Sequence, residues 1–344
     1  MGVTVKTFGK TKQKEDILLY TITNANGMSA SVTNFGAILV NLLVPDSKGT
    51  FKDVVLGLEK GTDYYKNGSF FGATVGRNAN RIGGAQAVID GVTYKFPVND
   101  GPNNLHTDFE IGMHMKLWDA VIKGNSVEFS VFSPDKEAGF PGNLNAKVTY
   151  TLRDDNAIEI SYEAVSDKKT IINMTNHTYF NLEGHNAGCI ENTELQLNCS
   201  KYTPVVKGAI PTGELADVEG TVFDFRTAKT IGQDINAKEQ QLKLVKGYDH
   251  NFVVDGYDGT ERLIAVAKAG GRTMEVYSDL PGVQFYAGNC IAKQKGKEGA
   301  KYNKRNGFCL ETQYFPDNAN QGNFKKAVFD AGETYKTKTV YKFV

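Results

Sequence analysis

The amino-acid sequence predicts an all-β protein, built as one large antiparallel β-sandwich with few short helices. Apolar and polar residues alternate over short stretches, which is typical of half-buried strands. Helical periodicity is weak, and 36 glycines supply turns between the strands. Turn dipeptides flanked by β-branched or aromatic residues recur along the chain: Asn26-Gly27, Asp90-Gly91, Asp255-Gly256 and Gly270-Gly271.

One hairpin shows the pattern clearly. Apolar residues alternate with polar ones from Val148 to Leu152, and the same alternation returns from Ile158 to Ala164. The polar run 153–156 between them, Arg-Asp-Asp-Asn, has the composition of a turn. Many such strands and turns in succession favour a sandwich.

Two short stretches, 63–67 and 234–245, are the candidate helices. No proline- or serine-rich linker, charge block or repeat interrupts the chain. Large β-sandwiches exceed about 200 residues as single units. We therefore expect residues 1–344 to form a single domain.

The composition excludes several classes of partner. Apolar residues make up 40% of the chain, which is enough for a sizeable core, and 39 basic residues balance 39 acidic ones. Such a balance offers no electrostatic surface for nucleic acid or an anionic membrane. No apolar run reaches the roughly 18 residues of a membrane span. Four cysteines without CxxC spacing predict buried free thiols. Together with an N-terminus that lacks an apolar signal core, this predicts a cytoplasmic protein.

The usual motifs of metal, nucleotide and serine-hydrolase sites are missing. The five histidines form no HExxH or HxH pattern, and neither GxGxxG, GxxxxGK[ST] nor GxSxG occurs. We therefore expect no metal and no cofactor. The chemistry that remains is acid–base work by side chains.

The stretch 173–182 carries the first candidate group. As a strand it places Asn173, Thr175, His177, Tyr179 and Asn181 on one polar face, with the apolar residues on the other. A polar face with a central histidine suits a ligand rich in hydroxyl groups. A purely structural histidine is the alternative.

The second candidate group is Glu311, in the apolar and aromatic stretch 307–316. Alternation puts Glu311 on the same face as Gln313. Burial of a carboxylate is costly and raises its pKa, so such a residue rarely lies in a core without a partner. The alternative is a surface glutamate on an edge strand.

Three loops combine polar side chains with turns, at 76–82, 99–106 and 247–250. Each is rich in Asn, Asp, Arg or His, which form hydrogen bonds with ligands. The alternative for all three is the capping of turns by Asn and Asp.

The strand around His177, Asn-x-Thr-Asn-His-x-Tyr-Phe-Asn-Leu, resembles the signature strand of the aldose 1-epimerase family. The likeness continues in order over nearly the whole chain, through the segments 76–82, 103–106, 139–144, 247–250, 281–286 and 308–313 and the end at 331–343. This resemblance implies a galactose mutarotase-like supersandwich. It also implies a free aldohexose as substrate, no cofactor, and a monomer or homodimer.

The resemblance also implies roles for individual residues. Glu311 becomes the general base at the C1 hydroxyl and His177 the general acid at the ring oxygen. The groups that hold the sugar become His106, Arg81, Asp249, Asn80 and Gln284. Opening a hemiacetal needs a proton removed from O1 and another delivered to O5, which suits this pair. Because a nearby carboxylate favours the imidazolium, we expect ionised Glu311 beside protonated His177 near neutral pH.

Two alternatives stay open at this point. A hexose-6-phosphate 1-epimerase needs basic residues around C6 of the sugar, and Arg81 alone is thin support. A non-catalytic sugar-binding module would not need both Glu311 and His177. The chain also departs from its apparent relatives, because Thr107 and Asp108 stand where similar sequences carry Gly-Gly. Within about 4–6 Å of His106 or His177, Asp108 would raise the pKa of that histidine; otherwise it only caps the turn.

Overall fold

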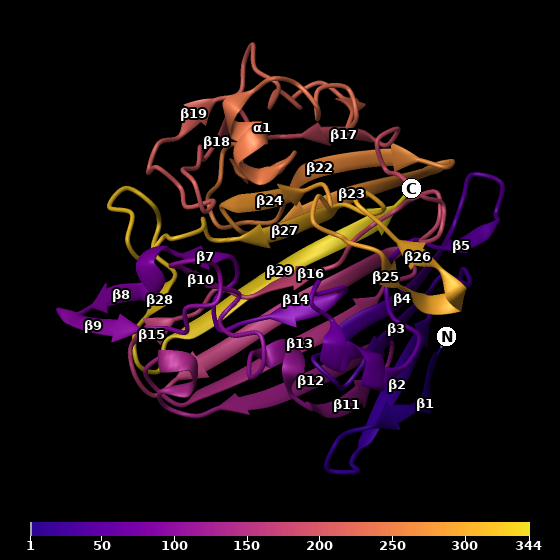
Figure 1. Ribbon diagram of the computed structural model, residues 1–344. Helices are drawn as coiled ribbons and strands as arrows, with labels where there is room; N and C mark the ends of the chain where they lie inside the picture. Colours follow the sequence, from indigo (N-terminus) through magenta and orange to yellow (C-terminus); the bar gives the residue numbers. More distant parts are fainter. Residues whose placement is uncertain (1) are drawn as a thin grey trace.

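The computed structural model describes residues 2–344, and nearly all of its regular structure is strand. The largest sheet has nine strands (Figure 1). In spatial order they are β11 (Asp119–Lys123), β12 (Ser126–Ser133), β13 (Leu144–Leu152), β14 (Ala157–Ser166), β29 (Thr334–Phe343), β23 (Arg272–Ser278), β22 (Arg262–Ala269), β17 (Glu194–Leu197) and β20 (Lys229–Thr230). The predicted hairpin is β13 and β14, so that prediction is confirmed.

Two five-stranded sheets accompany the large one. The first runs in chain order through β1 (Gly2–Lys10), β2 (Asp16–Thr23), β3 (Ser29–Thr33), β4 (Ile38–Pro45) and β5 (Phe51–Asp53). The second has the order β19 (Ala216–Asp217), β18 (Lys201–Tyr202), β21 (Asp249–Val253), β24 (Gly282–Tyr286) and β27 (Cys309–Gln313).

Short two-stranded pairs complete the β-structure. They are β6 (Ala73–Val75) with β16 (Thr175–His177), β7 (Arg81–Ile82) with β10 (Asn104–Leu105), β8 (Gln86–Ile89) with β9 (Val92–Lys95), β15 (Thr170–Ile171) with β28 (Val328–Phe329), and β25 (Gln294–Lys295) with β26 (Lys301–Tyr302). Within residues 2–344 every ladder between named strands is antiparallel, as predicted.

The predicted helices are present but shorter or differently wound. The only α-helix among residues 2–344 is α1 (Gln240–Val245). It begins later than the predicted 234–245 because the side chain of Glu239 accepts from the amide of Gln241 and caps it there. The stretch predicted at 63–67 is the 3₁₀ helix η1 (Gly61–Lys66). The other 3₁₀ turns are η2 (Gly83–Ala85), η3 (Met113–Met115), η4 (Glu137–Gly139) and η5 (Lys297–Gly299).

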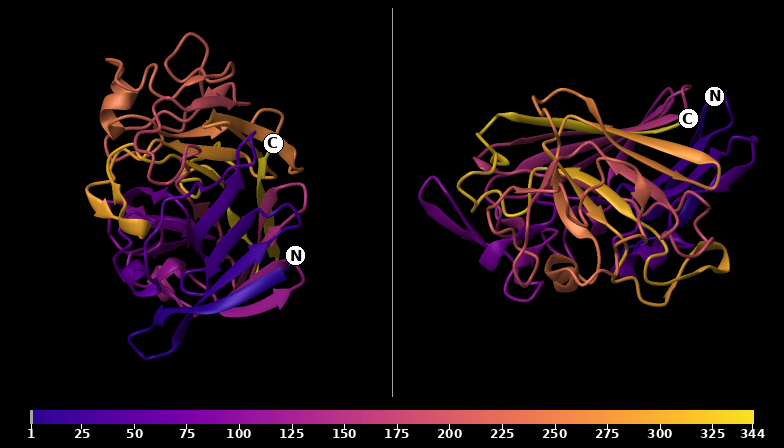
Figure 2. Two further views of the ribbon diagram at one scale, coloured as in Figure 1. Left: turned by 90° about the vertical axis from the view of Figure 1, so that its right-hand side faces the viewer. Right: turned by 90° about the horizontal axis from the view of Figure 1, so that it is seen from above.

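The core lies between the nine-stranded sheet and the strands that face it, and the view from above in Figure 2 shows these two layers. Strand β27 lies against β29, where the hydroxyl of Tyr341 donates to the carbonyl of Leu310 at 3.0 Å. The hydroxyls of Thr312 and Thr339 are also hydrogen-bonded to each other. These contacts tie the second five-stranded sheet to the largest one.

All four cysteines are free thiols. Cys199 and Cys309 are buried, as predicted, whereas Cys189 and Cys290 are exposed, so the prediction of burial was wrong for these two. No helix among residues 2–344 combines the length and apolar character that crossing a bilayer requires.

Candidate active site

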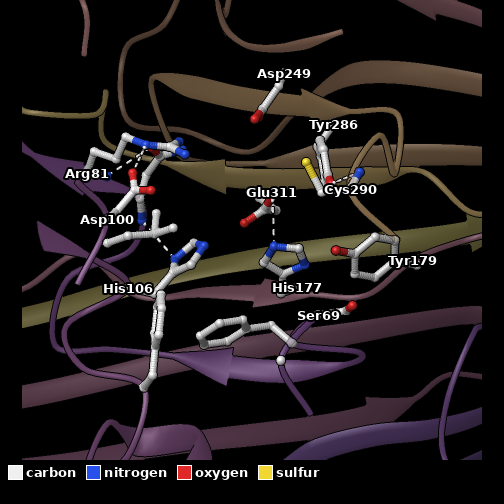
Figure 3. A pocket seen from close by; sticks show the side chains of 15 residues that line it. Ser69, Arg81, Asp100, His106, His177, Tyr179, Asp249, Tyr286, Cys290 and Glu311 are labelled. Carbon is white, nitrogen blue, oxygen red and sulfur yellow. Dashed lines mark hydrogen bonds and ion pairs between the residues drawn. The ribbon is translucent and has the colours of Figure 1, made fainter. Parts of the chain in front are cut away.

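A polar cavity of about 270 Å³ lies over the second five-stranded sheet (Figure 3). Its volume lies just below the range of about 300–1,000 Å³ that is typical of small-molecule sites, so only a small ligand fits. The walls include these residues, which were singled out from the sequence: Asn80, Arg81, His106, His177, Asp249 and Glu311. Residues far apart in the chain therefore meet at one place.

The floor of the cavity is built by the register of three strands. In β21, β24 and β27, Asn251 pairs with Gln284, and Gln284 pairs with Glu311. Two residues away on each strand, Asp249 pairs with Tyr286, and Tyr286 pairs with Cys309. Because side chains alternate between the two faces of a sheet, both rows point to the same side.

His177 reaches this floor from β16. The prediction of a continuous strand over 173–182 was wrong, since β16 ends at His177. The cause is local, because the side-chain oxygen of Asn176 accepts from the amide and the hydroxyl of Thr178 and replaces ladder bonds. The chain then meets the residue that precedes β27, where Phe180 and Phe308 exchange main-chain hydrogen bonds of 2.7 and 3.0 Å. This bridge brings His177 beside Glu311.

The polar face predicted for 173–182 is divided between two tasks. His177 and Tyr179 line the cavity. Asn173 instead donates to the carbonyl of Tyr314, and Asn181 donates to the carbonyls of Gly188 and Asn306. The asparagines therefore hold the main chain in place, and only the aromatic members of the face are available to a ligand.

His177 and Glu311 form a close, buried pair. Nε2 of His177 lies 3.7 Å from Oε1 of Glu311, and the residues are 5% and 2% exposed. The burial of Glu311 rules out the alternative of a surface glutamate. Oε2 of Glu311 is also buried and accepts no hydrogen bond from residues 2–344. No N–H or O–H group of these residues therefore stabilises a negative charge on Oε2.

Burial opposes a charge on either member of the pair. It lowers the pKa of His177 to about 4. It raises the pKa of Glu311 well above its usual range, and the neighbouring charge of Asp249 adds to this rise. Burial therefore favours the neutral form of both groups over the ion pair.

This differs from the ion pair expected from the sequence. That expectation considered the attraction between the two charges, whereas the burial of both groups acts against it. The two forms contain the same number of protons. Transfer of the carboxyl proton to Nε2 converts the neutral pair into the ion pair without exchange with solvent.

The loops 76–82 and 99–106 supply the next wall, because β7 and β10 pair Arg81 with Leu105. The amide of Asn80 donates to Nδ1 of His106 at 3.1 Å. Nδ1 then carries a lone pair, so neutral His106 has its proton on Nε2. Burial, with His177, Arg81 and His114 nearby, lowers the pKa of His106 well below its usual range. His106 is thus a neutral hydrogen-bond donor.

Arg81 and Asp249 add opposite charges to the cavity. Nε of Arg81 donates to Asp100 at 2.8 Å, and Asp100 also lines the cavity. Burial raises the pKa of Asp249, although Arg81 and a hydrogen bond from Gln284 oppose this rise. Gln284 is not itself a lining residue; its side-chain amide donates to Asp249 at 2.7 Å. The structure therefore places Gln284 as a support for Asp249.

Asp108 caps the turn that follows His106. Its carboxylate accepts from the amides of Glu110 and Ile111, at 2.7 and 2.9 Å. The groups that set the pKa of His106 and of His177 do not include it. Thr107 is structural too, since its hydroxyl accepts from the amide of Asn78 at 2.9 Å.

His106, His177 and Glu311 place one potential ligand atom each within 4.8 Å of one another, which is a geometry that a metal ion can use. Coordination by Nε2 of His106 would require a lone pair there. The amide of Asn80 opposes that, because it already donates to Nδ1. The cluster is better suited to moving protons than to holding a cation.

Sequence reasoning missed several residues of the cavity. Ser69, Phe70, Asp100, Tyr286 and Cys290 line it but were not singled out as site residues. Asp100 had a usable signal, since it lies in the polar loop 99–106 and a half-buried guanidinium such as that of Arg81 is expected to pair with a carboxylate. Phe70 had none, because its ring reaches His106 and His177, at centroid distances of 4.9 and 5.9 Å, only in the folded chain.

The fold and the cavity define a β-sandwich protein with a buried histidine–glutamate pair in a cavity sized for a small molecule. The model of one family, aldose 1-epimerase, matches residues 18–342. A galactose mutarotase of Bos taurus is 41% identical over 318 residues, covering 92% of this chain and 91% of its own. An aldose 1-epimerase of Escherichia coli is 36% identical over 331 residues, with 95% of both chains covered. The crystal structure of a galactose 1-epimerase from Lactobacillus acidophilus superposes with a TM-score of 0.87 at 31% identity, covering 100% of this chain and 99% of that one. This chain belongs to the aldose 1-epimerase family.

Proposed function

We propose that this aldose 1-epimerase interconverts the α and β anomers of free aldohexoses, such as galactose and glucose, with Glu311 and His177 as the proton-transfer pair. The observation that carries the proposal is the 3.7 Å approach of Nε2 of His177 to Oε1 of Glu311 inside the polar cavity. A carboxylate and an imidazole at this separation can flank the O1 and O5 atoms of one sugar ring.

The reaction begins from the ion-pair form. Glu311 removes the proton from O1 as the C1–O5 bond breaks and C1=O1 forms, and His177 delivers its proton to O5. Rotation about C1–C2 then presents the other face of the aldehyde. On closure O5 attacks C1, His177 recovers the O5 proton, and Glu311 returns a proton to O1. Atoms and protons balance over the cycle, and each residue exchanges its role as acid and base.

The remaining polar groups of the cavity are proposed to hold the sugar. His106 offers an N–H donor, Asp249 a half-buried acceptor and Arg81 a cationic donor, and these suit hydroxyl groups of different orientation. Fixing the ring in this way contributes to rate because the reacting atoms are already aligned. Asn80 acts partly through its main chain, which fixes the tautomer of His106.

The cavity is poorly suited to a sugar phosphate. Arg81 is the only lysine or arginine among its lining residues, and its guanidinium is already paired with Asp100. Asp249 adds a further carboxylate nearby. A phosphate dianion would meet more negative than free positive charge, so the charge balance favours an uncharged hexose.

Polarimetry on freshly dissolved α-D-galactose tests the proposal. We expect the protein to speed the approach to anomeric equilibrium, and Glu311→Gln to lose about 10²-fold or more of that rate while remaining folded. Glu163→Gln, on the exposed side of β14, is the matched control and should keep full activity. A wild-type rate equal to the spontaneous one would refute the function. More than about a tenth of the rate in Glu311→Gln would remove Glu311 as the base.

A cytoplasmic location and a monomeric or homodimeric state are also proposed. Four unpaired cysteines are compatible with a reducing compartment. Sedimentation equilibrium would give the oligomeric state directly.

A further inference from the structure

His177 has a side-chain contact that the mechanism above does not use. Sγ of Cys309 lies 3.5 Å from Nδ1 of His177, and both residues are buried. Cys309 precedes Glu311 by two positions on β27, so their side chains share a face. A single strand thus carries the proposed base and a thiol that contacts the proposed acid.

The thiol stays protonated in this setting. Burial raises the pKa of Cys309 well above its usual range, and the nearby carboxylates of Glu311 and Asp249 add to the rise. Cys309 is therefore neither a nucleophile nor a charge. A neutral thiol is a weak donor and a weak acceptor, and its sulfur can accept an N–H.

The proposed reaction dictates which nitrogen of His177 must be free. Nε2 faces Glu311 and takes back the proton of O5 on ring closure, so in the neutral imidazole Nε2 must carry the lone pair. The proton then lies on Nδ1. A buried N–H is expected to have an acceptor, and Sγ of Cys309 is the side-chain acceptor within reach.

We infer that Cys309 is a positioning residue whose sulfur accepts the Nδ1–H of His177 and holds the imidazole in the tautomer with a free Nε2. No bond to sulfur forms or breaks, and the Nδ1 proton stays in place in both the neutral and the cationic imidazole. The importance of Nε2 rests on the proposed function, whereas the tautomer is a property of the protein alone.

The main chain of His177 is the competing acceptor, because a hydrogen bond to it also acts on the ring. If the main chain alone fixed the tautomer, the thiol could be removed without effect. The experiment must therefore separate the sulfur from the carbonyl. Cys199 provides the matched control, since it is a buried free thiol like Cys309, whereas the thiol that contacts His177 is that of Cys309.

The first measurement is the ¹⁵N NMR spectrum of the histidine rings, at neutral pH and without sugar. We expect wild-type His177 to carry its proton on Nδ1, and Cys309→Ala to shift the ring toward a mixture with the Nε2–H tautomer. Cys309→Ser, which keeps an acceptor, should restore the wild-type pattern, and Cys199→Ala should leave it unchanged. A wild-type spectrum with the proton on Nε2 overturns the inference without any variant, even if Cys309→Ala fails to fold. An unchanged tautomer in Cys309→Ala overturns it as well.

The second measurement is mutarotation. Cys309→Ala should lower kcat by about 3- to 10-fold, the worth of one hydrogen bond, with KM for galactose nearly unchanged. Cys309→Ser should recover most of this loss. If wild type lacked mutarotation, the proposed function would fail while the NMR result would still report on the tautomer. A shifted tautomer with unchanged kcat would show that the contact does not serve the reaction.

Discussion

His250 should make the folded state sensitive to acid, although it lies outside the cavity. Its ring packs against Tyr202 and Phe223, at centroid distances of 5.8 and 4.7 Å, and its Nε2 has no hydrogen-bond partner within residues 2–344. Burial lowers the pKa of His250 to about 3. In the unfolded chain the same group titrates near 6.5.

The sign and size of the effect follow from these two pKa values. Between pH 6.5 and 3 the unfolded state binds a proton that the folded state does not, so acidification lowers the free energy of unfolding. At pH 5 the solution is about 1.5 units below the unfolded pKa, and each unit contributes about 1.4 kcal/mol. His250 alone should therefore cost about 2 kcal/mol at pH 5, out of a typical total of about 5–15 kcal/mol.

Urea unfolding of wild type and His250→Phe, at pH 7.5 and pH 5.0, measures this contribution. The buried Trp118 is the single tryptophan and provides the fluorescence signal. The free energy that the substitution itself costs is the same at both pH values and cancels in the comparison. The contributions of the other buried histidines are the same in both proteins and cancel as well. On going from pH 7.5 to pH 5.0, wild type should lose about 2 kcal/mol more than the variant. An equal loss in the two proteins would refute the assignment of a neutral, buried His250.

Further outcomes are expected for catalysis and for the architecture. Asp100→Asn should raise KM and lower kcat/KM for galactose by about 10-fold, because the carboxylate of Asp100 orients the guanidinium of Arg81. An unchanged KM would argue against that role. The pH profile of kcat/KM should be flat at neutral pH. The catalytic pair gains a second proton only as the pH falls toward the pKa of His177, about 4, and it loses its one proton only above the raised pKa of Glu311. An acid limb near pH 6.5 would contradict this expectation. Replacing Thr107 and Asp108 together by glycine should leave both pH limbs in place, and a shifted alkaline limb would revive the tuning hypothesis. Expressed separately, residues 1–165 and 166–344 should not fold, and a sharp melt of either half would show two domains.

Much of the fold could be predicted because strand periodicity is a local property. The hairpin of β13 and β14 was visible in the alternation of its own residues. The early end of β16 was not, since it depends on a side-chain bond from Asn176 that replaces the ladder at one point. Competition of this kind leaves little trace in the apolar pattern.

The members of the candidate site were easier to predict than their charge states. The resemblance to the family gave seven site residues, and all except Gln284 line the cavity: Glu311, His177, His106, Arg81, Asp249, Asn80 and Gln284. The expectation of an ion pair did not consider burial, because desolvation depends on neighbours such as Phe70 that come from elsewhere in the chain. Burial is a property of the whole fold, so a motif cannot report it.

The hydrogen bonds between β27 and β29 fix the register of β27, an edge strand, and the proposed reaction depends on this register. β27 pairs with a single strand of its own sheet, and further anchoring comes from Tyr341 and Thr339 in the other layer. A slip by one residue would bring Leu310 or Thr312 to the position of Glu311 and send the carboxyl group into the core. A misaligned molecule would then be inert rather than altered in selectivity. Recovery of activity during refolding would thus report the correct register of β27. Substitutions at Tyr341, which does not line the cavity, would reduce the fraction of active molecules without changing the KM of those that remain.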